Sequence, residues 1–256
     1  MPQLNVHYLP QFVAEADLAG GTVIVVDLLR ASTTVCYALS AGAKCIVPAV
    51  EVDETFAKAS TFQRADIVLG GERGGEIIEG FDLGNSPTDY TADQVFGRTV
   101  LFTTTNGTKA INHARLSARV LVGAAVNRRA VAAAVAADQQ VDILCAGTGG
   151  KVTREDLLAA GAIAHQLTTQ HSPPTTPRST NEWADSASGE WEELLNTAAA
   201  LGRTPSEQFA LELRDTLGGR NLLALGLDED LVTCAQLDKL DGVPILDKQS
   251  GEIRLL

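Results

Sequence analysis

Two short segments place a carboxylate next to an arginine, a combination that can hold a cation beside an oxyanion. Asp27 follows the apolar run TVIVV and stands three positions before Arg30 in DLLRASTT. Glu72 and Arg73 stand between two pairs of glycines in GGERGGE. A carboxylate binds a hard cation, whereas a guanidinium donates two parallel hydrogen bonds to a phosphate or sulfonate group. These residue types indicate Asp27 and Glu72 as metal ligands and Arg30 and Arg73 as oxyanion ligands.

The same segments and two others carry neutral groups that could complete a cradle for oxyanions. Hydroxyls, amides and the backbone N–H groups at a helix start all donate to phosphate, and glycine lets the backbone approach a ligand closely. The candidate substrate-binding residues are Ser32, Thr33, Asn85, Ser86, Thr104, Thr105, Asn106, Gly107, Thr108 and Gly147. A structural interpretation stays open for each segment, since Ser32 or Thr33 could cap a helix and both NSP and NG form ordinary turns.

A cysteine offers a second possible chemistry. Cys145 precedes Lys151 by six positions in CAGTGGK, a spacing similar to the Cys-x5-Arg of phosphatases that attack with a thiolate. Lysine cannot grip a phosphate with a planar fork, and the neighbouring Glu155 and Asp156 would raise the pKa of the thiol. The two acids could equally stabilise a helix N-terminus. We keep a Cys145 nucleophile as an alternative to direct attack by water.

Other functional classes lack their sequence signatures. No GxGxxG follows the first apolar run, and no GxxxxGK[ST], GxSxG or DxDx motif occurs where it would be needed. The four histidines show no metal-ligand spacing, so oxygen ligands indicate Mg²⁺ rather than Zn²⁺. With 20 basic and 32 acidic residues the formal charge is −12, which disfavours nucleic acid or an anionic membrane as the main partner.

The expected location is the cytoplasm. No apolar run reaches the roughly 18 to 20 residues of a membrane span, and the segment MPQLNVHYLPQFV has neither the basic start nor the apolar core of a signal peptide. Cysteine spacing shows no CxxC pair, so buried thiols are a better interpretation than a disulfide framework.

Apolar runs and helical spacing alternate along the 256 residues, which predicts an α/β fold with three layers, α/β/α, around a parallel or mixed sheet. Strands are expected at 22–27, 44–50, 66–70, 99–102, 119–122, 141–145 and 243–246, and helices from 32 or 33 to about 42 and at 52–64, 109–116, 128–137, 154–168, 191–202 and 207–216. In open α/β sheets ligands bind beyond the carboxyl ends of strands, where the candidate residues lie. We expect one domain over 1–256 with an elaborated C-terminal third, and a mobile loop over the Pro/Ser/Thr-rich 171–190.

Taken together, these segments resemble the 2-phosphosulfolactate phosphatase family. The matching stretches are VVDLLRASTT, GGERGGEIIEGFDLGNSPTDY, TTTNGTKA, CAGTGGKVTREDLLAAG, LGLDEDLVTCAQLD and VPILD, which reach from Val25 to Asp247. The resemblance implies a Mg²⁺-dependent phosphatase with a three-layer α/β architecture of its own. It would release phosphate from a sulfonated three-carbon hydroxy acid, a reaction of coenzyme M biosynthesis.

We therefore expect hydrolysis of a small anionic phosphoester by water, with Mg²⁺ held by Asp27, Glu72 and, as a third ligand, Asp156. Arg30 and Arg73 would neutralise the oxyanions. Two alternatives stay open, a small-anion binding protein without turnover and a nucleotide-dependent enzyme. A binding protein would gain nothing from carboxylates that face its ligand. The partner is a small molecule, and a homo-oligomer is left open.

Overall fold

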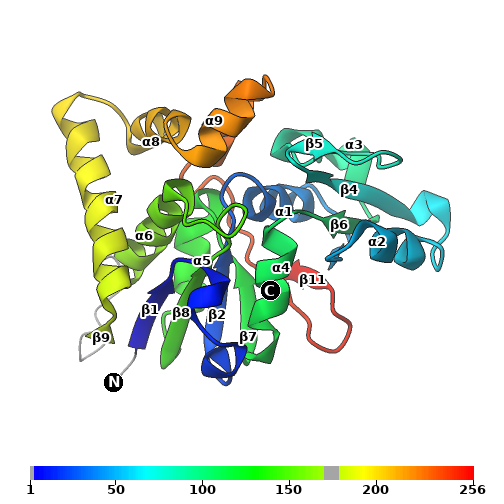
Figure 1. Cartoon of the computed structure of the whole chain (residues 1–256), viewed down its shortest axis with the longest axis horizontal. Helices are drawn as coiled ribbons and strands as arrows, with labels where there is room; N and C mark the ends of the chain where they lie inside the picture. Colours follow the sequence, from blue (N-terminus) through cyan, green and yellow to red (C-terminus); the bar gives the residue numbers. More distant parts are fainter. Residues whose placement is uncertain (1–2, 170–178) are drawn as a thin grey trace.

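One mixed sheet runs through the whole fold (Figure 1). The structure is a computed structural model that describes residues 3–169 and 179–256. Over this range the sheet has eleven strands in the order β5-β4-β6-β3-β11-β10-β7-β2-β8-β1-β9. The strands are β1 Gln3–His7, β2 Thr22–Val26, β3 Cys45–Pro48, β4 Ile67–Arg73, β5 Glu76–Ile77, β6 Thr99–Thr103, β7 Arg119–Val122, β8 Gln140–Cys145, β9 Ser179–Thr180, β10 Pro244–Leu246 and β11 Ile253–Leu255. The α-helices are α1 Ala31–Ser40, α2 Val52–Ala59, α3 Ala92–Val95, α4 Gly107–His113, α5 Arg128–Ala134, α6 Arg154–Thr169, α7 Glu182–Ala200, α8 Pro205–Arg214, α9 Leu217–Ala224 and α10 Asp228–Cys234.

The sheet consists of two parallel blocks joined by an antiparallel hairpin. Strands β7, β2, β8 and β1 pair in parallel, and so do β3, β6 and β4. Between the blocks, β10 pairs antiparallel with β7 and with β11, and β11 pairs antiparallel with β3. The three reversals make the two blocks run in opposite directions. The sheet is also strongly twisted, because β2 and β8 stand upright in Figure 1 whereas β4 lies across the view.

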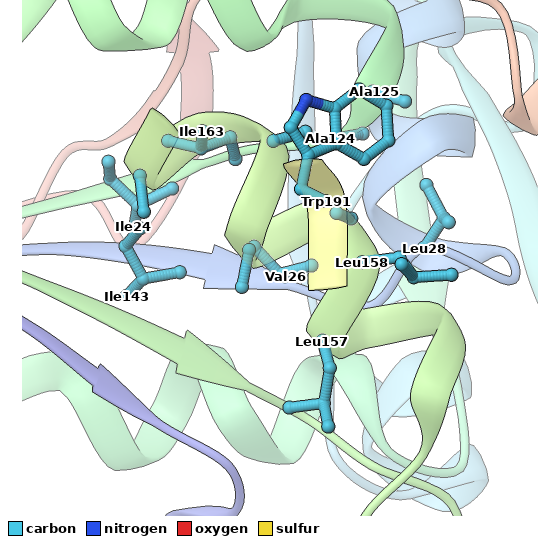
Figure 2. Close-up of a cluster of buried hydrophobic side chains, with 14 of the residues drawn as sticks. Ile24, Val26, Leu28, Ala124, Ala125, Ile143, Leu157, Leu158, Ile163 and Trp191 are labelled. Atoms are coloured by element: carbon cyan, nitrogen blue, oxygen red, sulfur yellow. The ribbon is translucent and has the colours of Figure 1, made fainter. Parts of the chain in front are cut away.

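Helices cover both faces of the sheet, as the alternation of apolar residues requires. Ile24 and Val26 of β2 point to the face covered by α5, α6 and α7, while Val23 and Val25 point to the face covered by α1 and α4. Figure 2 shows part of the first core, in which the Trp191 ring of α7 lies beside Ala124 and Ala125 and which also contains Leu157, Leu158 and Ile163 of α6. Leu69 and Leu101 form a smaller core beneath α2. The predicted three-layer α/β/α class is confirmed.

Most central strands and helices lie where the sequence predicts them, and two expectations are wrong. Helix α7 begins at Glu182 rather than Trp191, so the expected mobile loop over 171–190 is helical in its second half. The Asn181 side chain caps this helix by accepting the Ala184 N–H at 2.8 Å. Residues 170–178 lie outside the described residues. The expected loop after residue 70 also begins later, because β4 continues to Arg73.

Within the described ranges, no helix is both long enough and apolar enough to span a membrane.

Candidate active site

Loops that follow four strands meet around a cavity of about 230 Å³. They come from both parallel blocks of the sheet, from β2 and β8 in one block and from β4 and β6 in the other. Helix α9 forms the opposite wall, and Figure 1 shows it above the ends of the central strands. The cavity is lined by Asp27, Leu29, Arg30, Glu72, Gly74, Gly75, Asn85, Thr105, Asn106, Thr148, Gly149, Gly218, Asn221, Leu222 and Leu225. The structure thus brings together one member or more of each sequence segment that we singled out.

Two buried carboxylates face this cavity. Glu72, near the end of β4, is held firmly: its Oε1 accepts the Thr105 N–H at 2.7 Å and its Oε2 accepts the Gly75 N–H at 2.7 Å. Asp27 is held more loosely, with a 3.4 Å contact from the Ala31 N–H to its Oδ1. No side chain or backbone group in the described ranges donates a hydrogen bond to Asp27 Oδ2. Asp27 therefore has an oxygen available for a ligand.

The surroundings of Asp27 favour its neutral form. Burial and, next in size, the nearby negative charge of Glu72 together raise the pKa of Asp27 to about 7, against weaker opposing effects of the Ala31 N–H and Arg30. A Cβ on Gly107 would lie 2.8 Å from Asp27 Oδ2, so only a glycine lets the start of α4 approach the carboxylate this closely. Such a site gains stability from any cation that compensates the two acids.

Arg30 is the guanidinium at the cavity. Its Nη1 donates to Asp230 Oδ2 at 2.7 Å and to Ser86 Oγ at 2.9 Å, and its Nη2 donates to the Gly75 carbonyl at 2.8 Å. These bonds leave the Nε–H and one Nη2 proton without a partner among the described residues. Arg30 can still donate two hydrogen bonds to an oxyanion.

Asn85 supplies an unpartnered polar atom at the same cavity. Its side chain is buried, and its Oδ1 has no hydrogen-bond partner within the described ranges. A buried polar atom without a partner is costly, and a bound ligand, ion or water normally satisfies it. Asn106 lies at the start of α4, where its Oδ1 accepts the Gly149 N–H at 3.2 Å. Thr105 donates its hydroxyl to Glu72 at 3.2 Å.

Asp156 lies behind the cavity rather than in its wall. Its Oδ1 accepts the Leu28 N–H at 2.8 Å, and its Oδ2 accepts the Gly147 N–H at 2.9 Å. Burial, followed by the charges of Asp27 and Glu155, raises the pKa of Asp156. Asp156 and Gly147 thus hold the loops after β2 and β8 together, and Asp156 as a metal ligand stays a prediction.

Arg73 points away from the cavity. Consecutive strand residues alternate between the faces of a sheet, so Glu72 and Arg73 cannot both face one ligand while β4 continues through them. The Arg73 Nη2 donates to the Val50 carbonyl at 2.7 Å and to Thr103 Oγ1 at 3.0 Å. In this structure Arg73 braces the ends of β4 and β6, and its role as an oxyanion ligand stays a prediction.

The predicted hydroxyl cradle is mostly occupied by the protein's own backbone. Ser32 Oγ accepts the Asp27 N–H at 2.8 Å, and Thr33 Oγ1 donates to the Leu28 carbonyl at 2.9 Å. Thr108 Oγ1 donates to the Thr104 carbonyl at 3.0 Å. Neither Ser32 nor Thr33 caps α1, because the N-cap is Arg30 and has no side-chain cap bond. Ser32, Thr33, Thr104 and Thr108 thus shape the loops. Thr105 and Asn106 line the cavity.

Comparison with known proteins identifies the chain. The family described as 2-phosphosulpholactate phosphatase matches residues 7–249. The chain belongs to this family. A probable 2-phosphosulfolactate phosphatase of Symbiobacterium thermophilum is 37% identical over 241 residues, which cover 94% of this chain and 96% of the relative. Proteins with the same description from Caldanaerobacter subterraneus subsp. tengcongensis and from a Cyanothece species are 34% and 35% identical, and the matches cover 94% and 95% of this chain and 93% and 96% of those relatives.

In this member of the 2-phosphosulfolactate phosphatase family, Cys145 is poorly placed as a nucleophile. Its side chain is fully buried at the end of β8 and is not part of the cavity wall. Burial, followed by the charge of Asp156, raises the pKa of the Cys145 thiol well above its usual value. A thiolate is therefore disfavoured at neutral pH.

The donor set of the cavity suits a hard cation held by few protein ligands. No group of three or more His, Cys, Asp or Glu side chains is arranged to hold a metal in the part of the chain that the structure describes. Mg²⁺, however, commonly keeps several waters and binds through one or two carboxylates together with the phosphate of its substrate. Asp27 and Glu72, beside the unpartnered Asn85 Oδ1, fit that kind of site.

The C-terminal helices also contribute to the site, which the sequence did not indicate. Asp230 of α10 pairs with Arg30, and the cavity is lined by Asn221 and Leu222 of α9 and by Leu225 directly after it. The stretch LGLDEDL contains three acids in the first turn of α10, which a sequence alone cannot distinguish from acids that favour the helix dipole.

Proposed function

We propose that this phosphatase-family member hydrolyses 2-phosphosulfolactate, or a similar small phosphomonoester, to the hydroxy acid and phosphate with Mg²⁺. One observation carries the proposal: Asp27, Glu72 and Arg30 line the same small cavity, and Arg30 keeps two N–H groups without a partner among the described residues. Carboxylates beside the oxyanion ligand would repel a phosphate unless a cation lies between them. The arrangement therefore suits a phosphoryl group that binds together with a divalent ion.

Each residue has a separate task in this proposal. Mg²⁺ held by Asp27 and Glu72 would polarise the phosphoryl group and lower the pKa of a water. Arg30 orients the phosphoryl oxygens through its Nε–H and its one free Nη2 proton, and Asn85 Oδ1, an acceptor, would lie on the cation side of the site. Thr105 and the Gly75 N–H keep Glu72 in place. Leu29, Leu222 and Leu225 exclude bulk water from the remaining wall.

To test this proposal, phosphate release would be assayed with a panel of phosphorylated hydroxy acids, with and without a sulfonate. We expect release with Mg²⁺, loss of release with a chelator, and recovery when Mg²⁺ is added back. Activity that survives exhaustive chelation would contradict the metal. Binding of the panel without any release would contradict the enzyme and favour a small-anion binding protein.

Metal binding has a readout that does not need turnover. Mg²⁺ should raise the melting temperature of the wild-type protein, because a ligand that binds only the native state stabilises it. Asp27→Asn and Glu72→Gln should each lose most of this shift. An equal shift in all three proteins would place the cation elsewhere.

The same proposal locates the enzyme in the reducing cytoplasm, where sulfolactate would serve coenzyme M formation. The four cysteines of the chain are free and buried. Disulfides persist in oxidising compartments and are rare in the cytosol.

A further inference from the structure

We infer that Asp230 is a positioning residue, which fixes the Arg30 guanidinium so that its free N–H groups face the cavity. The inference rests on the proposed function, because it assigns the residue that prepares Arg30 for the phosphoryl group. Asp230 belongs to α10, 200 positions after Arg30.

Arg30 and Asp230, both buried, form a closed triangle of hydrogen bonds with the half-buried Ser86. Asp230 Oδ2 accepts from Arg30 Nη1 at 2.7 Å and from the Ser86 hydroxyl at 2.8 Å, while Ser86 Oγ itself accepts from Arg30 Nη1 at 2.9 Å. The side chains of Arg30 and Asp230 are 3% and 5% exposed. An ion pair away from water is weakly screened and holds its geometry, unlike an exposed pair.

The triangle decides which donors of Arg30 remain free. Both Nη1 protons are taken by Asp230 and Ser86, and one Nη2 proton is taken by the Gly75 carbonyl. A guanidinium is planar and rigid, so fixing one side of it fixes the direction of the other. The Nε–H and the second Nη2 proton are left to bind an oxyanion in the cavity.

Other acids would compete for Arg30 if Asp230 were absent. Arg30 lies close enough to Asp27 and Asp89 for its charge to lower the pKa of both carboxyls, against the larger raising effect of burial on each. Without Asp230, the guanidinium would be drawn towards Asp27. It would then neutralise the carboxylate that the proposed cation needs and lose its orientation towards the phosphoryl group.

A double-mutant cycle tests whether Asp230 acts through Arg30. We would compare the wild type, Asp230→Asn, Arg30→Gln and the double variant by kcat/KM and by the dissociation constant of inorganic phosphate from calorimetry. Asp230→Asn should weaken phosphate binding about tenfold, the lower end for hydrogen bonds to a charged group. In the Arg30→Gln background the same change should alter binding and kcat/KM less than about twofold.

Asp228→Asn is the matched control. Asp228 lies in the same first turn of α10 and makes an exposed ion pair with Arg214, at 3.3 Å. Its substitution should leave both measurements within about twofold of wild type. If Asp230→Asn merely loosened α10, the melting temperature would fall and the loss would persist in the Arg30→Gln background.

The possible results separate the inference from the proposed function. Losses that multiply in the double variant, or phosphate binding unchanged in Asp230→Asn, would overturn the inference even with an active wild type. A wild type that binds phosphate but hydrolyses no phosphoester would contradict the proposed function alone, since the binding cycle still measures the coupling. A wild type that binds no phosphate would overturn the inference, and its turnover would decide the function separately.

Discussion

Glu155 of α6 accepts the backbone N–H of Gly218 at 2.9 Å, and this contact fixes the first turn of α9 beside the cavity. A Cβ on Gly218 would press against Glu155 Oε1 and would lie 3.4 Å from the Leu29 Cβ. Glycine at this position therefore allows α9 to approach α6 and the loop after β2. The position of the cavity wall therefore depends on the absence of a Cβ at Gly218.

Gly218→Ala should displace α9 and impair substrate binding. Because the new methyl group meets a buried carboxylate, we expect a stability loss of about 1–3 kcal/mol, as in other overpacked interiors, and a raised KM. Phosphate-release kinetics and chemical denaturation measure the two effects.

Gly189→Ala provides the contrast to that change. Gly189 lies inside α7, and no atom lies within 4 Å of the place that a Cβ would take there. Alanine at this position should stabilise the protein by about 1 kcal/mol and leave KM unchanged. A lower stability in Gly189→Ala, or an unchanged KM in Gly218→Ala, would contradict this account of the two glycines.

Cys145→Ser should leave most of the turnover intact. The thiol is buried outside the cavity, so the hydroxyl should cost only about 1–3 kcal/mol of stability through an unsatisfied polar group. Asp27→Asn should instead reduce phosphate release by several orders of magnitude. A folded but inactive Cys145→Ser beside an active Asp27→Asn would restore the thiolate mechanism.

Stability of the metal-free protein should fall between about pH 4 and pH 7. The pKa of Asp27 is raised from 3.8 to about 7, so in this window the native protein keeps a proton that the unfolded chain has released. Each pH unit should then remove up to about 1.4 kcal/mol of the free energy of unfolding for this group. Below pH 4 the contribution is fully present.

Comparison with Asp27→Asn measures how much of this pH dependence requires the Asp27 carboxyl. Glu155 and Asp156 also have raised pKa values and add to the slope in both proteins. The charge of Asp27 also contributes to the raised pKa of Asp156, so the difference between the two denaturation curves across pH 4 to 7, in the presence of a chelator, reports Asp27 together with its effect on Asp156. Parallel curves would show that its pKa is ordinary in the folded protein.

Asp156→Asn separates a structural role from a metal ligand. Both carboxylate oxygens accept backbone N–H groups, so an amide must turn an N–H towards one of them. We expect a loss of about 1–3 kcal/mol in the free energy of unfolding. The Mg²⁺-induced rise in melting temperature should survive if Asp156 only braces the loops. Its disappearance, as expected for Asp27→Asn, would make Asp156 a ligand.

The sequence predicts those parts of the site that depend only on the order of strands, loops and helices along the chain. Asp27 follows an apolar strand and Asn106 precedes a helix, so both fall at loop positions that a strand–helix pattern identifies. Arg73 departs from expectation because the glycines before it suggested a loop. Gly70 and Gly71 lie within β4, and Gly71 lets that strand approach the Thr103 carbonyl.

The parts that the sequence does not predict depend on distant pairing. Asp230 reads as one of several acids opening a helix, and only the folded chain shows that it pairs with Arg30. The first turns of α7 are rich in polar residues, which is why the sequence predicts a loop there. Two signals nevertheless indicate the helix: Asn181 is a good N-cap, and a buried stripe is formed by Ala184, Ala187, Trp191 and Leu194.

The hairpin of β10 and β11 has a consequence for how the protein is made. It is the only strand pairing in the described sheet that joins the block containing β2 to the block containing β4. Asp27 follows β2 in one block, and Glu72 lies near the end of β4 in the other block. During synthesis the two parallel blocks can form early, but they cannot pair with each other through β10 and β11 until residues 244–255 have left the ribosome. We therefore expect the cavity to be assembled only after translation has passed this point, with the unpaired edges of β7 and β3 exposed to aggregation or to chaperones until then.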